Sequence, residues 1–469
     1  MRSTVFLLSS ILLTGLLAAG CTPAPAPPPD SPDASGYGVP GALERARIKT
    51  AIVEEKLRTA LLPAMRAHGI DMWIVLDREN HPDPLHEEIG GGFAGVRSAY
   101  IFFDSGGAEP EKIYLGSHVQ PGDSVIEQVY DEKVYYGYSE EGITPHLREA
   151  VHSRDPERIG INTSRTLPEA DGLTVAFRDV LVESIGSPYA DRLVSAELLI
   201  RDFRNLRTPL ERDLYRQLTE WTARWETEGL TGSHVIPGET TALEMAGWFE
   251  DKAMELGMGS FQTVRVVREG DLLPRHDPDI AIEPGDIVAV DAGLFYLQFE
   301  SDMKRTAYVL APGETEPPQS IRDAWAEVIQ TSRLYASKMV PGAIGHEVYE
   351  AIIEEALRDG YVRDTRTDPS VGNVGPEHEI ALYGHSLGND LHDIGARVAP
   401  DMPFAYGDRV RFALVEGEFV AMEFHVGVPI PEWEGKKWSA RYEEIAVVGS
   451  EGLEELIPFQ TELLLIPSR

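Results

Sequence analysis

Carboxylates inside apolar strands are the feature that most constrains how this chain can fold. Asp291 follows the apolar run Ile287–Val290, and Asp302 begins another predicted strand shortly after it. Glu423 stands inside the apolar run Phe419–Phe424. A buried carboxylate is costly unless it is paired, protonated or bound to a cation. The fold must therefore bring these side chains to common partners.

A glycine-rich segment carries two histidines that can join these carboxylates. His385 and His392 are seven residues apart within Tyr383–Asp393, and glycines on both sides of His385 allow the backbone to come close to a ligand. Glu443 follows Arg441 on the edge of a further predicted strand.

Together these residues form a candidate metal site with mostly oxygen ligands. Hard divalent ions such as Mn²⁺ or Mg²⁺ suit such a set, and Zn²⁺ or Co²⁺ remain alternatives. Four carboxylates are enough to bridge two ions about 3.5–4 Å apart, which would polarise a carbonyl and generate hydroxide from a bridging water. The predicted ligands are Asp291, Asp302, His385, Glu423 and Glu443.

The chain divides near residue 204. Thr208, Pro209 and Glu211 predict a helix start, because threonine suits the N-cap, proline the first helical position, and glutamate the position three residues after the cap. Helices then alternate with paired strands, which predicts an α+β domain over residues 204–469. Residues 42–203 predict an α/β domain with a mixed sheet that includes Met72–Leu76.

The N-terminus has the layout of a cleaved secretory signal. Arg2 precedes the apolar stretch Val5–Leu17, and small residues lead to Cys21, the single cysteine. Leu-Ala-Ala-Gly-Cys resembles a bacterial lipoprotein signal, which implies removal of residues 1–20 and a diacylglyceryl group on Cys21. Thr22 at the next position, by resemblance to enterobacterial lipoproteins, indicates the outer membrane.

Residues 21–41 predict a tether, because their many prolines favour extended conformations and cannot pack a core. We therefore expect a lipid-anchored protein of the bacterial cell envelope, held at the outer membrane and facing the periplasm. The formal net charge of −35 argues against nucleic acid as a partner, because phosphate binding needs a basic surface.

The order of the predicted ligands resembles the pita-bread metallopeptidases: aminopeptidase P, prolidase and methionine aminopeptidase. The resemblance rests on four segments of the chain, which match the family's two aspartate motifs, its histidine motif and its last glutamate motif: Val290–Gly293, Ser301–Thr306, Gly384–Asp393 and Arg441–Glu444. It covers residues from about 204 to 467. More weakly, residues 42–203 are similar to the N-terminal domain of the aminopeptidase P, prolidase and creatinase branch.

The resemblance implies roles for individual residues. Glu423 would take the proton of the bridging water as well as bind metal. His392 would hydrogen-bond the scissile carbonyl, His276 would contact substrate, and Arg441 would orient Glu443. The family's cofactor would be two divalent ions, with Mn²⁺ the first expectation and Co²⁺ or Zn²⁺ as alternatives.

The implied reaction is hydrolysis of short peptides at Xaa-Pro bonds by an Xaa-Pro aminopeptidase or dipeptidase, in a homo-oligomer. The sequence does not choose between these two activities. Two positions depart from the family pattern: Ser386 replaces the glycine after the ligand histidine, and Phe424-His425 replaces Pro-Gly after the ligand glutamate.

Two other interpretations remain open. Gly384–Gly388 also fits Gly-x-Ser-x-Gly, the nucleophile elbow of serine hydrolases, with Ser386 as nucleophile. That hypothesis needs a helix after the serine and leaves the four carboxylates unexplained. The third hypothesis is a non-catalytic pita-bread protein that binds partners.

Overall fold

The computed structural model describes residues 36–272, 280–364 and 375–468. The predicted signal peptide, Cys21, most of the proline-rich tether and His276 lie outside the described residues. No helix in these three ranges combines the length and the apolar character needed to cross a membrane.

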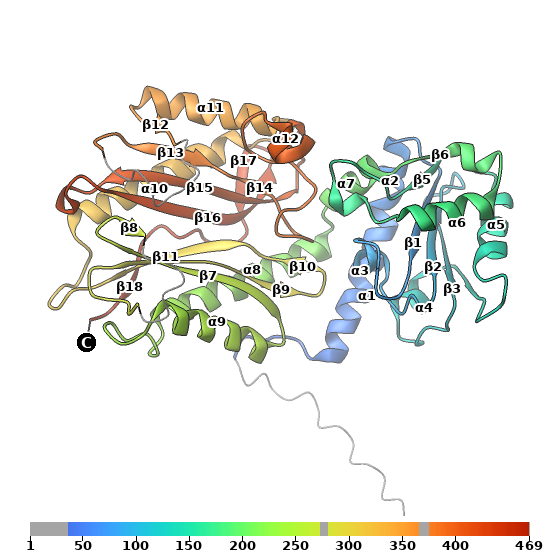
Figure 1. Ribbon diagram of the computed structural model, residues 1–469, viewed down its shortest axis with the longest axis horizontal. Coiled ribbons are helices and arrows are strands. Elements are labelled where there is room, and N and C mark those ends of the chain that lie inside the picture. Colours follow the sequence, from blue (N-terminus) through green and yellow to red (C-terminus); the bar gives the residue numbers. More distant parts are fainter. Residues whose placement is uncertain (1–35, 273–279, 365–374, 469) are drawn as a thin grey trace, which may run out of the picture.

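The N-terminal part contains a six-stranded mixed sheet with the order β4-β3-β2-β1-β5-β6 (Figure 1). β1 pairs antiparallel with β2 and parallel with β5, as the sequence predicts for a mixed sheet. The strands are β1 Met72–Asp77, β2 Ser98–Phe103, β3 Glu111–Gly116, β4 Glu132–Tyr135, β5 Ile159–Ile161 and β6 Leu193–Ser195.

Alternate residues of β1 pack on opposite faces of this sheet, because successive strand side chains point to opposite sides. Trp73 and Val75 join one buried cluster, whereas Met72 and Ile74 join another. The helices of this part are α1 Ala42–Thr59, α2 Leu61–Ala67, α3 His86–Ile89, α4 Val125–Val129, α5 Thr144–His152, α6 Val175–Ile185 and α7 Glu197–Asn205.

The C-terminal part contains two further six-stranded sheets. The first has the order β18-β11-β9-β7-β8, with β10 paired to β9, and the second the order β12-β13-β15-β16-β17, with β14 paired to β15. The first comprises β7 Gly259–Arg268, β8 Asp271–Leu272, β9 Ile287–Tyr296, β10 Phe299–Glu300, β11 Met303–Val309 and β18 Leu464–Ile466. The second comprises β12 Val362–Arg363, β13 Glu379–Leu382, β14 His385–Ser386, β15 Phe419–Pro429, β16 Lys437–Gly449 and β17 Gly452–Glu455.

Long helices cover the outer sides of these two sheets, so that the sheets face each other (Figure 1). α8 and α9 lie along the first sheet, and α10 and α11 lie along the second. The helices are α8 Pro209–Thr231, α9 Ala242–Leu256, α10 Gln319–Lys338, α11 Gly345–Arg358 and the short α12 Pro403–Tyr406. The chain thus has the α+β architecture that the sequence predicts, and β11 of one sheet contacts β16 of the other.

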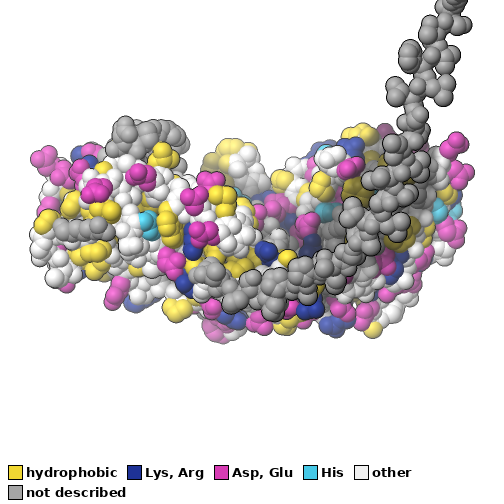
Figure 2. Space-filling model, turned by 90° about the horizontal axis from the view of Figure 1, so that it is seen from below, with side chains coloured by type: hydrophobic (Ala, Val, Ile, Leu, Met, Phe, Trp, Pro, Cys, Tyr) yellow, Lys and Arg dark blue, Asp and Glu magenta, His cyan; other side chains and the backbone are white. Residues whose placement is uncertain are grey.

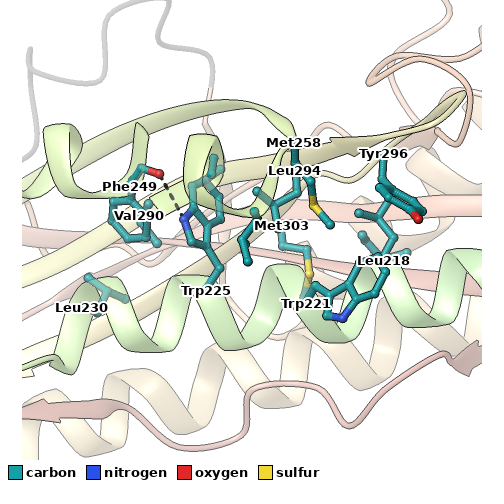
Figure 3. Packing of buried hydrophobic residues seen from close by; sticks show 14 of the residues in the cluster. Leu218, Trp221, Trp225, Leu230, Phe249, Met258, Val290, Leu294, Tyr296 and Met303 are labelled. Carbon is teal, nitrogen blue, oxygen red and sulfur yellow. Dashed lines mark hydrogen bonds between the residues drawn. The ribbon is translucent and has the colours of Figure 1, made fainter. Parts of the chain in front are cut away.

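The core under the first sheet is built from α8 and α9. Leu218, Trp221 and Trp225 of α8 point toward Val290 and Leu294 of β9 (Figure 3). The indole N–H of Trp225 donates to the carbonyl oxygen of Phe249 at 3.1 Å, so this large buried ring leaves no polar atom unpaired. This packing fixes β9, which carries Asp291.

The predicted capping box at the start of α8 is confirmed. The Thr208 hydroxyl accepts from the Glu211 backbone N–H at 3.3 Å, and the Glu211 carboxylate accepts from the Thr208 backbone N–H at 2.7 Å. Glu211 also accepts from Lys56 of α1 at 2.9 Å, in a pair that is almost fully buried. The helix start is therefore tied to the N-terminal part of the molecule.

Replacing Thr208 by alanine removes one of these two reciprocal bonds and leaves a helix N–H without its partner. We expect Thr208→Ala to lower the free energy of unfolding by about 1 kcal/mol. The urea midpoint followed by tryptophan fluorescence measures the change. Thr59→Ala at the end of α1, where the side chain is exposed, is the control, and equal midpoints for the two variants would contradict a stabilising cap.

Acidic side chains are spread over the whole face shown in Figure 2, with lysines and arginines among them. The net charge of −35 is thus not gathered into one patch on this face. Such a distribution fits a role in solubility.

Candidate metal centre

The predicted ligands come together between the two C-terminal sheets. Side-chain ligand atoms lie within 4.8 Å of one another in three overlapping groups. The first sheet supplies the two aspartates, from β9 and from the residue before β11, and the second supplies the histidine and the two glutamates, from β14, β15 and β16. The groups are Asp302–His385–His392, His385–Glu423–Glu443 and Asp291–Asp302–Glu443.

Strand register explains why these side chains meet. Glu423 and Glu443 are direct antiparallel partners in β15 and β16, so their side chains lie on the same face. β9 continues beyond Asp291 to Tyr296, because β7 pairs with it as far as Phe295. Asp302 precedes β11, which pairs antiparallel with β9.

The geometry of His385 suits a metal ligand. Its Nδ1 lies 3.0 Å from the Ser386 carbonyl oxygen, which can only accept, so Nδ1 carries a proton, and Nε2 faces the cluster 3.4 Å from Oε1 of Glu443. Nε2 of His385, Oδ1 of Asp302 and Oε1 of Glu443 are all buried and have no hydrogen-bond partner in the described parts of the chain. Three unpaired ligand atoms at one place fit a bound cation.

The buried carboxylates of the centre affect one another's pKa values. Burial, followed by the negative charge of Glu443, raises the pKa of Asp302 well above its usual range. Burial also raises the pKa of Glu443. For Glu423 burial acts in the same direction, but Lys304 and His385 outweigh it and hold the pKa at about 2. Repulsion among carboxylates is thus only partly relieved by the protein's own cations.

Two cations in the centre were missed by sequence reasoning. Lys304 of β11 contacts Glu423 at 2.9 Å and Asp291 at 3.4 Å, and it also pairs with Glu443. Arg265 of β7 donates to Asp291 at 3.1 Å. The signal for Lys304 was its position two residues after Asp302, which places both side chains on one face of a strand.

His392 lies beside the ligand histidine. The two imidazole rings of His385 and His392 are 4.5 Å apart in an edge-to-face arrangement. Burial and the neighbouring His385 lower the pKa of His392 to about 4, so its imidazole is neutral near pH 7. His392 can therefore donate one hydrogen bond and accept another without carrying charge.

The predicted role of Arg441 stays a prediction. Arg441 lies two residues before Glu443 on β16, opposite His425 of β15, but no hydrogen bond joins it to Glu443 among the contacts of the described residues. Charges of Arg265, Glu423 and Asp291 surround its guanidinium.

His425 has its Nε2 3.1 Å from Asp364 and its ring against Tyr383.

The glycines around His385 accommodate protein side chains rather than an open ligand space. A Cβ at Gly384 would lie 2.1 Å from the Tyr335 hydroxyl, and a Cβ at Gly388 would lie 2.3 Å from Arg207. The close approach that the sequence predicts is therefore real, but its partners are Tyr335 and Arg207.

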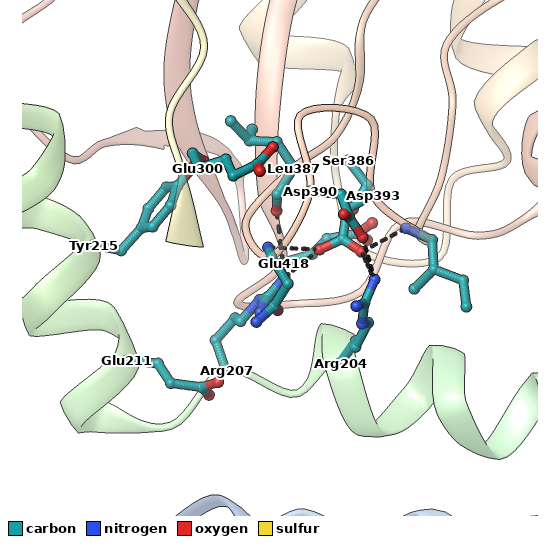
Figure 4. Close-up of polar contacts among 12 residues, drawn as sticks. Arg204, Arg207, Glu211, Tyr215, Glu300, Ser386, Leu387, Asp390, Asp393 and Glu418 are labelled. Atoms are coloured by element: carbon teal, nitrogen blue, oxygen red, sulfur yellow. Dashed lines mark hydrogen bonds and ion pairs between the residues drawn. The ribbon is translucent and has the colours of Figure 1, made fainter. Parts of the chain in front are cut away.

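Two arginines that follow the N-terminal sheet hold the loop that carries His392 (Figure 4). Arg204 donates to Asp390 at 2.6 Å and to Asp393 at 3.0 Å, and it also pairs with Glu88 of α3. Arg207 donates to Asp393 at 2.8 Å. The loop is thus positioned by contacts with the segment that joins the two parts of the chain.

Ser386 does not have the setting of a nucleophile elbow. It lies on the two-residue strand β14 and is 1% exposed, and turns rather than a helix follow it. A nucleophile elbow requires a sharp turn from a strand into a helix with the serine accessible. The structure therefore gives no support to the serine-hydrolase hypothesis.

Buried carboxylates and a histidine, held between two facing sheets with ligand atoms that have no hydrogen bond among the described residues, indicate a metal-binding centre. The sequence profile of metallopeptidase family M24 matches residues 216–450, half of the chain. The chain belongs to this metallopeptidase family.

Relatives of known activity and structure agree with this family. The Xaa-Pro dipeptidase of Pyrococcus furiosus is 26% identical over 187 residues, which are 40% of this chain and 44% of that protein. The X-Pro aminopeptidase of Thermotoga maritima has a TM-score of 0.61 at 16% identity, over 86% of this chain and 100% of that chain. The Xaa-Pro dipeptidase of Bacillus anthracis has a TM-score of 0.55 at 20% identity, over 90% of this chain and 100% of that chain. The two structural likenesses show the fold alone.

Proposed function

We propose that this metallopeptidase cleaves short peptides at Xaa-Pro bonds, as an Xaa-Pro aminopeptidase or an Xaa-Pro dipeptidase. The observation that carries the proposal is the convergence of unpaired ligand atoms of Asp302, His385 and Glu443 beside Glu423 and His392. The activities of the relatives, an Xaa-Pro dipeptidase and an X-Pro aminopeptidase, support the substrate class.

The residues of the centre have distinct tasks in this proposal. A divalent ion held by Asp302, His385 and Glu443 would act as a Lewis acid on the scissile carbonyl, and the oxygen-rich ligand set favours Mn²⁺. Glu423 faces the same space, and its carboxylate can accept the proton of the attacking water. His392, neutral near pH 7, can donate a hydrogen bond to the carbonyl oxygen as negative charge develops there.

The first test is release of amino acids from matched Xaa-Pro, Xaa-Pro-Yaa and Xaa-Ala-Yaa peptides by the full-length chain loaded with Mn²⁺. We expect release from the proline peptides to fall by about 10²-fold or more in a chelated sample, because the electrostatic stabilisation of the oxyanion is lost. The preferred peptide length distinguishes dipeptidase from aminopeptidase. Absence of release from the proline peptides, with metal verified as bound, would refute the substrate proposal.

We also propose that the protein is anchored by lipid on Cys21 to the outer membrane, faces the periplasm and assembles into a homo-oligomer. The support for the anchor is the leader pattern before Cys21. Incorporation of labelled fatty acid into the expressed chain tests it, and labelling that persists in Cys21→Ala would contradict it.

A further inference from the structure

Lys304 occupies the interior of the carboxylate cluster because of its backbone position. It is the direct antiparallel partner of Asp291, in the pairing of β11 with β9. Partner residues of an antiparallel pair project their side chains to the same face, with Cβ atoms about 4.5–5.5 Å apart. The side chain that faces Asp291 across the sheet is therefore a lysine, and it is only 5% exposed.

The ammonium group divides the ligand atoms of the centre into two sets. The Lys304 ammonium group pairs with Oδ2 of Asp291 at 3.4 Å, with Oε1 of Glu423 at 2.9 Å and with Oε2 of Glu443. Arg265 also donates a hydrogen bond to Oδ2 of Asp291, at 3.1 Å. Among the residues that the structure describes, Oδ1 of Asp302, Nε2 of His385 and Oε1 of Glu443 have no hydrogen bond, and the last two atoms lie 3.4 Å apart.

A two-ion centre would need the atoms that Lys304 holds. One ion can use the unpaired atoms, but a second would have to share Asp291 and Glu443 with an ammonium group that forms ion pairs with both. Like charges at such separations repel strongly in a buried site. The competing cation is part of the chain, and its place opposite Asp291 is fixed by the pairing of β11 with β9.

The balance of charge in the cluster also favours one bound divalent ion over two. The cluster contains four carboxylates, and Lys304 and Arg265 already neutralise part of their charge. One divalent ion supplies the remainder, whereas a second would leave an excess of positive charge. Arg441 nearby adds to that excess.

In place of the two ions that the sequence predicts, we infer that the centre binds one divalent ion, at Asp302, His385 and Glu443, and that the Lys304 ammonium takes the place of the second. This inference rests on the proposed metal-dependent function. Lys304 replaces the positive charge of an ion but supplies no vacant coordination position, so Asp291 acts as its counter-ion and not as a metal ligand.

The test counts bound ions in the full-length chain by equilibrium dialysis against Mn²⁺ with elemental analysis. We expect one ion per wild-type chain and two per chain in Lys304→Thr, which frees the carboxylate oxygens. Lys304→Arg keeps the charge and should bind one. Lys437→Thr is a matched control: Lys437 is a buried lysine that pairs with Glu379 in the neighbouring sheet, and its variant should also bind one.

A second readout does not depend on catalysis or on the stability of the lysine variants. Electron paramagnetic resonance of Mn²⁺ distinguishes an isolated ion from a magnetically coupled pair, and we expect the isolated signal in the wild type. Asp291→Asn should retain the ion, because Asp291 is a counter-ion of Lys304.

The outcomes separate the two proposals. Two ions per wild-type chain, a coupled signal or no bound ion would overturn the inference, as would loss of the ion in Asp291→Asn. One bound ion without hydrolysis of proline peptides would instead refute the proposed function and leave the inference standing. Two bound ions with hydrolysis of proline peptides would support the proposed function and overturn the inference of a single ion.

Discussion

Replacing Asp302 by asparagine is expected to abolish tight metal binding and to lower kcat/KM on a proline peptide by about 10³-fold or more. Asp302 is 6% exposed, and its Oδ1 has no hydrogen-bond partner among the residues that the structure describes. Its carboxylate belongs to two of the three groups of ligand atoms. An asparagine keeps the shape but loses the negative charge, so a divalent ion loses a principal attraction.

The measurement combines elemental analysis of the purified variant with steady-state kinetics. Asp286→Asn is the control, because Asp286 is also a buried aspartate, precedes β9 and pairs with Arg268 outside the centre. That control should keep its metal and its activity. Metal affinity of Asp302→Asn equal to that of the wild type would remove Asp302 from the ligand set.

The centre was predictable where its signals are local. Each carboxylate stands in or beside an apolar run, and the cost of burying a charge marks it as a ligand or an ion-pair member without any knowledge of its neighbours. The start of α8 was predictable for the same reason, since Thr208 and Glu211 form their capping bonds within four residues and Pro209 stands at the first helical position between them.

The role of Lys304 was not predictable, because it depends on pairing between strands. Alternation along one strand places Lys304 on the same face as Asp302, but only the register of β11 against β9 places it opposite Asp291. Its contacts with Glu423 and Glu443 cross from one sheet to the other, over separations of more than a hundred residues.

The glycines illustrate a second limit. The sequence predicts that another group lies close to the backbone at Gly384 and Gly388, and this is correct. It does not identify that group, because Tyr335 of α10 and Arg207 are far from these glycines in the sequence. The domain boundary near residue 204 likewise stays a prediction, although α7 ends at Asn205 and α8 begins at Pro209.

Arg204→Leu is expected to destabilise the protein by about 3–5 kcal/mol, because it leaves the buried Glu88 without its arginine and removes one of the two arginines that pair with the buried Asp393. Arg204 is 2% exposed and contacts Glu88 of the N-terminal part and both Asp390 and Asp393 of the loop that carries His392. Leucine fills part of the volume but cannot compensate these charges. The loss should also reduce kcat while metal content stays unchanged, since His392 would no longer be held.

The pH dependence of this effect follows from Asp393. Burial raises the pKa of its carboxyl, but Arg204 and Arg207 outweigh burial and hold the pKa at about 2, below the ordinary value of 3.8. A carboxyl with a depressed pKa contributes stability above its unfolded pKa, and that contribution is lost as the pH falls through the folded pKa. The part of the difference between wild type and Arg204→Leu that comes from Asp393 should therefore be full well above pH 3.8 and narrow as the pH falls toward 2.

Urea unfolding at a series of pH values measures this difference, with kcat and bound metal determined at pH 7. Arg66→Leu is the control, because Arg66 forms a two-bond ion pair with Asp104 at the surface, where solvent and salt screen the charges and little stability is expected to be lost. Arg204→Lys keeps one charge and should recover part of the stability and of kcat. An unfolding midpoint of Arg204→Leu equal to that of Arg66→Leu at pH 7 would show that the buried network does not hold the loop against the N-terminal part.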